Sequence, residues 1–597
     1  MTWVQPEDLV GHEFRQAAED GRAQAAEPLL RVWLAAGGHL APTHAGASPT
    51  PAAPRLRALA TDLLTALDAL PRPWAATEPD TWPPAPTTRP EGGAGAGPGA
   101  RAGGWIGAGA GSPTPPLPET GGRPPAPQGT DTSPPGAAPG PAPAPHPRPG
   151  AAPARGSALA PQHGDTPPPE TAQAAPQAPA PHPRPGAAPT ARPGGSPHPV
   201  AGPGVPGSPA GAPGPVGPAA RSGTGPGADA PGCVTARRDA APAVDSALRR
   251  RLEAAWLGRA VGCVLGKPVE KLPLHGIRAL ARAAGNWPLD DWFTERGVPP
   301  EVLAAHPWNR RSAPTSLAEN IDGAPEDDDL NYPLLGLLLL RRHGRGFTTA
   351  DVGRLWLDEL PAGRTFTAER VAYRNLLQGL EPPATATHHN PFREWIGALI
   401  RADVHGWTNP GAPAAAAAQA YRDAALTHTG NGVYAALFVA AATATAATGR
   451  ADVHTALRAG LAVVPPRSRL AEAVRSGIAA AGREPDFDAV VDHLHARYGH
   501  YHWVHAVPNT ALIAAALTHA DGDFTRSVCH AVSGGWDTDS NGATAGALAG
   551  LIADSPDAVP HRWTAPLKNR LATSVPGFDG IGFDALAHLT AQEAARP

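Results

Sequence analysis

The chain has 597 residues and a formal net charge of −4, with 76 Pro and 68 Gly. This length allows several domains, but Pro and Gly are concentrated in one region, so only part of the chain can form a core. The net charge shows no excess of basic residues that would favour nucleic-acid binding. Three widely spaced Cys exclude a disulfide framework or a zinc cluster. The sequence contains no run of ~20 apolar residues that could span a bilayer.

The first residues, MTWVQPEDLVGHEF, lack a basic region followed by an apolar stretch, so no signal peptide is expected. We therefore expect a soluble, cytoplasmic protein that binds neither membranes nor nucleic acid. Abundant Ala, Pro, Gly and Arg beside scarce Lys is typical of GC-rich bacterial genomes.

Residues 1 to about 75 predict a small helical N-terminal unit, because apolar residues recur there at helical spacing. These are Leu29, Leu30, Trp33, Leu34, Leu56, Leu59, Leu63, Leu64 and Leu67. Pro71 and Pro73 end the pattern. The sequence leaves open what this unit binds, and an unidentified protein is the partner we consider.

Residues 76–243 are dominated by Pro, Ala and Gly, and the segment PAPHPRPGAAP occurs twice in them. Pro at this density blocks helices and sheet ladders, and little here can be buried to offset chain entropy. We expect a long disordered linker, with ligands for proline-binding domains as the alternative.

Residues 244–597 predict an all-α domain of many Ala-rich helices, since no convincing run of alternating strands is present. The first helix is expected to be capped by Ser246, and it carries Gly258, Gly262 and Gly266 on one stripe. Such a stripe lets another helix approach closely. Further helices are expected at about 333–343, 350–360, 433–447, 454–463, 468–480, 487–497, 508–519 and 542–553.

Four consecutive acids, Glu326 to Asp329, precede a helix whose start is predicted at Asn331 and Pro333. The helix dipole favours negative charge there by only ~0.3–1 kcal/mol per group, less than the repulsion among four carboxylates. We therefore expect a cation among them. An acidic, solvated turn is the alternative.

The stretch GGWDTDSNGATAGALAG, residues 534–550, also places Asp537, Asp539 and Ser540 before an apolar helix. Hard oxygen ligands without Cys or organised His favour Mg²⁺ or Mn²⁺ over zinc, and two acid pairs suit a two-metal centre. A calcium loop is excluded, because Leu548 stands where that loop needs a bidentate Glu.

A third segment, GRAVGCVLGKPVEK at 258–271, ends in Glu270. Its Gly262 to Lys267 stretch is one residue short of a P-loop, and Pro268 replaces the Ser or Thr, so nucleotide hydrolysis by a P-loop is not expected. Cys263 is interpreted as an inert core thiol.

In this order the three segments resemble the ADP-ribosylglycohydrolase family. The family combines a Gly-rich helix ending in Leu-Gly-x-Pro-x-Glu, a Thr-Asp-Asp-Thr-like motif and a late Gly-Gly-Asp-Thr-Asp-Thr-Asn motif. In this chain the three motifs correspond to GCVLGKPVE, EDDD and GGWDTDSN. The resemblance covers residues from about 248 to 590 and none of the first 243.

The resemblance implies a compact multi-helix domain with two Mg²⁺ (or Mn²⁺) ions in a cleft. Carried over residue by residue, it implies a metal-binding set of Glu326, Asp327, Asp328, Asp537, Asp539 and Ser540. Glu270 matches the glutamate near the metals and the leaving group, and we expect Glu270 and Asp328 to activate water or transfer a proton.

Several positions depart from the family pattern. Glu326 and Asp329 replace Thr, and Ser540 replaces a further Thr but keeps its hydroxyl. Cys263 stands where many members have Asp, and Trp536 is inserted after the glycine pair. Because Glu326 adds charge, metal occupancy or substrate is expected to differ from the best-known members.

The implied activity is hydrolysis of the glycosidic bond at ribose C1″ of an ADP-ribosylated protein or small molecule, releasing ADP-ribose. Two alternatives stay open: a glycohydrolase of another ribosyl or nucleoside compound, and a module that binds ADP-ribose without cleaving it.

Four residues are candidates for substrate binding. The N–H groups of Gly534 and Gly535 are expected to meet the diphosphate, with a tight turn as the alternative. Trp536 is expected to stack on adenine. His428 is expected to line the cleft, with an internal hydrogen-bonded histidine as the alternative.

Overall fold

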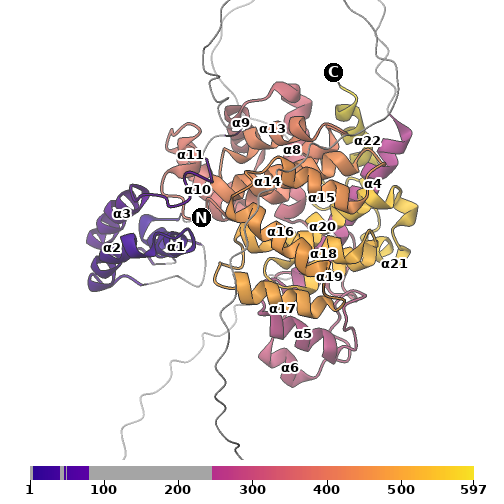
Figure 1. Cartoon of the computed structure of the whole chain (residues 1–597), viewed down its shortest axis with the longest axis horizontal. Coiled ribbons are helices and arrows are strands. Elements are labelled where there is room, and N and C mark those ends of the chain that lie inside the picture. The colour runs from indigo at the N-terminus through magenta and orange to yellow at the C-terminus, as the bar shows by residue number, and fades with distance from the viewer. Residues whose placement is uncertain (1–3, 40–45, 49, 80–81, 83–244, 597) are drawn as a thin grey trace, which may run out of the picture. The chain divides into compact units, whose positions relative to one another are not determined.

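The computed structural model describes residues 4–39, 46–48, 50–79, 82 and 245–596 (Figure 1). In these ranges the chain forms α-helices and short 3-10 helices and no strand beyond isolated bridges, which confirms the all-α prediction. The expected disordered linker falls mostly on residues 83–244, outside the described ranges. No described helix has both the length and the apolar character that crossing a membrane requires.

The N-terminal unit consists of α1 (Pro6–Glu19), α2 (Ala23–Ala35) and α3 (Pro54–Asp68). Trp33, Leu63, Leu64 and Leu67 are buried as the periodicity predicts, whereas Leu34 is 45% exposed. These helices and the C-terminal region belong to one compact unit, formed by Met1–Gly92 together with Val234–Pro597.

Helix α4 (Ser246–Gly266) packs against α20 (Thr538–Ala553) through facing glycines. A Cβ on Gly258 would lie 2.1 Å from the carbonyl oxygen of Gly546, and one on Gly262 would lie 1.8 Å from that of Gly542. The contacts advance along α4 while they recede along α20, so the two helices are antiparallel. The glycine stripe therefore receives a second helix, as predicted, at a distance that any side chain would prevent.

The cap of α4 lies one residue before the predicted one, because the side chain of Asp245 accepts from the N–H of Ala247. Helix α8 (Asp328–His343) begins earlier than predicted, with Asp327 as its N-cap instead of Asn331. Pro333 therefore lies inside the helix, where it cannot donate to the carbonyl of Asp329.

The acidic residues accordingly belong to first helical turns instead of preceding loops. Asp328 and Asp329 open α8, and Asp539 and Ser540 open α20, which starts four residues before its predicted position. At the start of α8 the N–H of Asp329 donates to the side chain of Asp327, and at the start of α20 the N–H of Ser540 donates to that of Asp539.

The remaining α-helices agree with the predicted ones to within a few residues and add several that the sequence analysis did not identify. They are α5 (Leu274–Ala283), α6 (Pro300–Ala305), α7 (Ala313–Ser316), α9 (Thr349–Glu359), α10 (Thr367–Leu377), α11 (Ala384–Thr387), α12 (Asp403–Trp407), α13 (Pro413–Ala424), α14 (Gly430–Ala446), α15 (Val453–Ala462), α16 (Arg469–Ala481), α17 (Phe487–Tyr498), α18 (Ala506–Ala520), α19 (Phe524–Ser533), α21 (His561–Thr564) and α22 (Phe583–Ala594). The 3-10 helices are η1 (Lys267–Val269), η2 (Gly344–Gly346), η3 (Ala362–Arg364), η4 (Ile396–Arg401), η5 (Pro556–Ala558) and η6 (Ala565–Leu567).

Candidate metal and catalytic site

The packing of α4 on α20 brings two acidic segments together. Helix α4 ends at Gly266, where a Cβ would lie 2.3 Å from the backbone of Thr538 at the start of α20. The hydroxyl of Thr538 donates to the carbonyl of Gly266 at 2.8 Å. The residues that follow α4, including Glu270, therefore lie beside the first turn of α20.

One acidic group joins Glu270 to Asp537 and Asp539, with one carboxylate oxygen of each residue within 4.8 Å of the others. Asp537 and Asp539 are buried, and Glu270 is half-buried. Asn309 donates to Glu270 at 2.8 Å, and the Lys271 ammonium lies 2.9 Å from it. Three hard oxygen donors at this spacing fit a divalent cation such as Mg²⁺ or Mn²⁺.

A second group joins Asp327 and Asp329 to the sulfur of Cys263, again within 4.8 Å. Cys263 is fully buried, and burial raises the pKa of its thiol well above the ordinary value, so it is protonated and hydrogen-bonds to Asp327. The sequence predicts an inert core thiol at Cys263, whereas the structure places it beside the acidic residues. The signal that could have identified it is its position one turn before Lys267 on the same helix face.

Two cations lie among these acids, as the sequence analysis expected. The ammonium of Lys267, which is buried, forms an ion pair with Asp327. The fully buried Arg259 donates to the carbonyl of Asp329 at 2.6 Å and pairs with Asp403. Arg259 thus donates to the carbonyl of Asp329, which has no helical donor because Pro333 lacks an N–H.

The carboxylates differ in protonation because only some have a cationic partner. Burial would raise the pKa of Asp327, but Lys267 outweighs it and holds the pKa below the ordinary value. Burial and the charges of Glu270 and Asp327 raise the pKa of Asp539 to about 7. Burial followed by repulsion from Asp539 raises the pKa of Asp537 well above its usual range. In the Glu270 group, Asp537 and Asp539 therefore favour the protonated form when no cation is bound.

Asp328 and Ser540 lie at the boundary between the two groups. Burial, then Asp327 and Asp539, raise the pKa of Asp328 well above its ordinary value. The hydroxyl of Ser540 donates to Asp329 at 3.4 Å. Both residues are thus close to the carboxylates with which the sequence analysis grouped them.

Glu326 lies outside both groups. Its carboxylate is 2.5 Å from Arg364 and accepts from the N–H of Ser574 at 2.9 Å and from Asn331 at 3.1 Å. These contacts occupy Glu326 with structural partners, so the negative charge added in place of Thr is compensated locally.

The turn before α20 does not offer the free N–H groups that we expected. The N–H of Gly534 donates to the carbonyl of His530, and that of Gly535 donates to the carbonyl of Val532. Both N–H groups therefore have partners at the end of α19, as the tight-turn alternative requires, and their contact with a diphosphate stays a prediction.

Trp536 is 7% exposed and has a left-handed backbone with φ of 57°. Its ring is stacked on the ring of His495, with centroids 4.0 Å apart and planes 5° from parallel. His495 also contacts the carbonyl of Gly534 at 2.8 Å. The sequence analysis missed His495, which covers one face of the indole proposed to stack on adenine.

His428 is buried in a separate network. Its Nδ1 lies 2.5 Å from the hydroxyl of Thr427, which accepts from Arg401. Burial, followed by the nearby Arg401, lowers the pKa of His428 well below its usual range. This environment matches the internal-histidine alternative, and His428 is in neither acidic group.

A family comparison covers all three sequence segments. A family model described as ADP-ribosylglycohydrolase matches residues 245–594. A solved structure described as an "ADP-ribosylglycohydrolase-related protein complex" is 22% identical over 59% of this chain and 99% of its own, with a TM-score of 0.38. No curated protein sequence matches the chain.

Proposed function

The chain belongs to the ADP-ribosylglycohydrolase family, which makes it a glycosidic-bond hydrolase, and we propose that it releases ADP-ribose from an ADP-ribosylated substrate with the help of divalent metal. The observation that carries the proposal is the convergence of Glu270, Asp537 and Asp539 beside the Asp327 segment. Hydrolysis would occur at ribose C1″ of a modified protein or small molecule.

We assign two Mg²⁺ (or Mn²⁺) ions to this site. Glu270, Asp537 and Asp539 would hold one, and Asp327 with Asp328 would contribute to the other. When bound, such ions supply Lewis-acid chemistry: they hold ribose hydroxyls and lower the pKa of a water. Lys267 pairs with Asp327, so an ion held by that carboxylate would share it with an ammonium.

The chain's own residues would supply charge and protons. Cleavage at C1″ develops positive charge on the sugar, and the buried carboxylates stabilise this charge. Asp328 would exchange a proton with the leaving group. Glu270, fixed by Asn309 and Lys271, is positioned to accept a proton from the attacking water.

The proposal is tested with the Asp539→Ala variant. This change removes a carboxylate from the Glu270 group, so we expect it to abolish metal-dependent release of ADP-ribose while the far-ultraviolet circular dichroism stays helical. The matched control is Asp322→Ala, which removes an acid whose side chain is 63% exposed and pairs with Lys568. Full activity in Asp539→Ala would refute the mechanism.

One observation favours a second candidate, a module that binds ADP-ribose without cleaving it. The second acidic group contains a protonated thiol and an ammonium partner, which weaken it as a metal site. Turnover by the wild-type chain separates the candidates. The panel is ADP-ribosyl-arginine, ADP-ribosyl-serine, an ADP-ribosylated base and other ribosyl compounds, each with Mg²⁺ and with Mn²⁺.

A further inference from the structure

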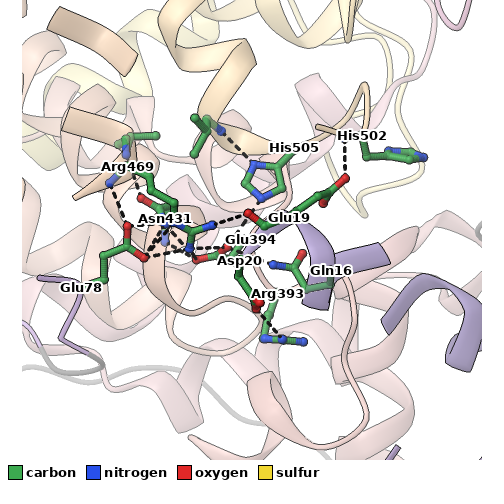
Figure 2. Close-up of polar contacts among 12 residues, drawn as sticks. Gln16, Glu19, Asp20, Glu78, Arg393, Glu394, Asn431, Arg469, His502 and His505 are labelled. Carbon is green, nitrogen blue, oxygen red and sulfur yellow. Dashed lines mark hydrogen bonds and ion pairs between the residues drawn. The ribbon is translucent and has the colours of Figure 1, made fainter. Parts of the chain in front are cut away.

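The N-terminal helices make buried polar contacts with a charged face of the C-terminal region (Figure 2). We call this face the Arg393 face, and it consists of Arg393, Glu394, Asn431, Arg469, His502 and His505. Figure 2 shows Gln16, Glu19, Asp20 and Glu78 directed toward it. The sequence analysis treated the N-terminal unit as separate, and these contacts join it to the region that carries the acidic site.

Two of the contacts with the Arg393 face are ion pairs between buried groups. Arg393 donates to Glu13 at 2.7 and 3.0 Å. Arg469 donates to Glu78 at 2.8 Å and to Glu394 at 2.9 Å. Because a buried charge without its partner is strongly unfavourable, these pairs favour a permanent association over a transient one.

A path of hydrogen bonds continues from the N-terminal helices to the metal site. Glu19, at the end of α1, accepts from the N–H of His502 at 2.7 Å. The next residue, Trp503, accepts through its carbonyl from the amide of Asn509 at 2.8 Å. The amide oxygen of Asn509 accepts from the N–H of Asp537 at 3.1 Å and from Asn541 at 2.7 Å.

The same segment also lies near Lys271, the partner of Glu270. The ammonium of Lys271 lies 5.7 Å from the ring centre of Trp503, and it pairs with Glu270 at 2.9 Å. The segment around residue 503 is therefore connected to Asp537 through Asn509 and to Glu270 through Lys271. Glu19 holds the backbone of this segment by accepting from the N–H of His502.

We propose that the N-terminal helices are a positioning element of the metal site, and that Glu19 and Asn509 are its positioning residues. Neither residue needs to touch metal or substrate. Glu19 holds the backbone at His502, and Asn509 transmits that position to the turn that carries Asp537. The inference rests on the proposed function in one respect, that the Glu270 group binds divalent metal.

The test compares Glu19 variants of the full chain by Mn²⁺ titration. Glu19→Ala removes the acceptor for the His502 N–H, and we expect its Mn²⁺ affinity to fall about threefold to tenfold, below the ~10–100-fold typical for partners that touch ligands directly. Glu19→Gln keeps an acceptor oxygen and is expected to keep wild-type affinity. The control is Glu27→Ala, which removes an exposed i,i+4 pair with Arg31 like that of Glu19 with Arg15.

Hydrogen exchange followed by mass spectrometry gives a readout without metal. Glu19→Ala is expected to speed exchange in peptides covering 502–509 and 534–541, while α14 and α16 keep wild-type rates. Asn509→Ala is expected to show the larger loss of Mn²⁺ affinity, ~10–100-fold, because Asn509 contacts the Asp537 turn.

The outcomes separate this inference from the proposed function. Wild-type affinity and wild-type exchange in Glu19→Ala overturn the inference, even if Asn509→Ala does not fold. Equal losses in Glu19→Gln and Glu19→Ala also overturn it, because the acceptor oxygen would then not matter. A wild-type chain that binds no Mn²⁺ contradicts the metal site itself, and the exchange rates still decide the positioning role.

Discussion

Burial and mutual repulsion control the charge of the carboxylates at the starts of α8 and α20. Asp327 is ionised beside Lys267, whereas burial and, after it, repulsion from neighbouring acids raise the pKa values of Asp537 and Asp539. In the absence of metal such groups favour protonation. A divalent cation replaces those protons, so metal affinity and pH are linked at this site.

This linkage predicts how stability depends on pH. The pKa of Asp539 is about 7 in the folded protein, against ~3.9 in an unfolded chain, so the unfolded state loses its proton first as pH rises. The metal-free protein should therefore lose stability between about pH 4 and pH 7. Bound Mn²⁺ should raise the melting temperature more at about pH 8 than at about pH 5.

The measurement is thermal unfolding at both pH values, with Mn²⁺ and with a chelator. Asp322→Asn is the control, because the side chain of Asp322 is exposed, whereas Asp537 and Asp539 of the metal site are buried. Equal melting-temperature increases at both pH values would contradict the assignment of buried, protonated carboxylates to the metal site.

At the scale of elements, the site depends on how closely α4 and α20 pack. Gly262→Ala would place a Cβ 1.8 Å from the carbonyl oxygen of Gly542, and a helix backbone cannot rotate away as a side chain can. Overpacking costs ~1–3 kcal/mol and occasionally more, and we expect the unfolding free energy to fall by at least the upper value. Urea denaturation measures this change.

The same variant should also weaken Mn²⁺ binding, since the ends of α4 and α20 carry Glu270, Asp537 and Asp539. Gly346→Ala is the matched control, because a Cβ there meets nothing within 4 Å. Its unfolding free energy should stay within ~0.5 kcal/mol of wild type. Wild-type stability in Gly262→Ala would show that the two helices are farther apart than described.

The sequence predicted the elements that depend on local pattern. The stripe of Gly258, Gly262 and Gly266 predicted a close helix partner, and the spacing of acids predicted two acidic helix starts. The start of α8 shifted because Asp327 caps this helix in place of Asn331, whereas α20 starts at Thr538 after Asp537, whose side chain makes no capping hydrogen bond. Local propensity does not distinguish among neighbouring cap residues of similar strength.

Contacts between distant segments were not predictable from the pattern. The pairing of Lys267 with Asp327 and the stacking of Trp536 on His495 join residues that are many positions apart in the chain. The saturation of the Gly534 and Gly535 N–H groups depends on how α19 ends. Each of these features needs the fold, because no periodicity or motif in one segment specifies its partner.

At the scale of the molecule, two stretches of chain separated by residues 93–233 form one compact unit. The N-terminal stretch contributes Glu13 and Glu78 as partners of Arg393 and Arg469, and all four side chains are buried. The C-terminal stretch expressed alone would leave those two arginines without these partners. We therefore expect the stability of this unit to depend on these ion pairs more than on the covalent connection between the two stretches.

We therefore predict that residues 1–92 and 234–597, expressed together as two polypeptides, co-purify as a complex. The complex should have a melting temperature close to that of the full chain, whereas 234–597 alone should be less stable by ~3–5 kcal/mol, the typical loss when one partner of a buried ion pair is removed.

Glu13→Gln with Glu78→Gln in the smaller piece should weaken co-purification, because each change removes the charge that pairs with an arginine. Glu27→Ala, which affects an exposed pair, should leave it unchanged. If 234–597 alone has the stability of the full chain, the N-terminal helices are an accessory to the fold, and the requirement for residues 1–92 is wrong.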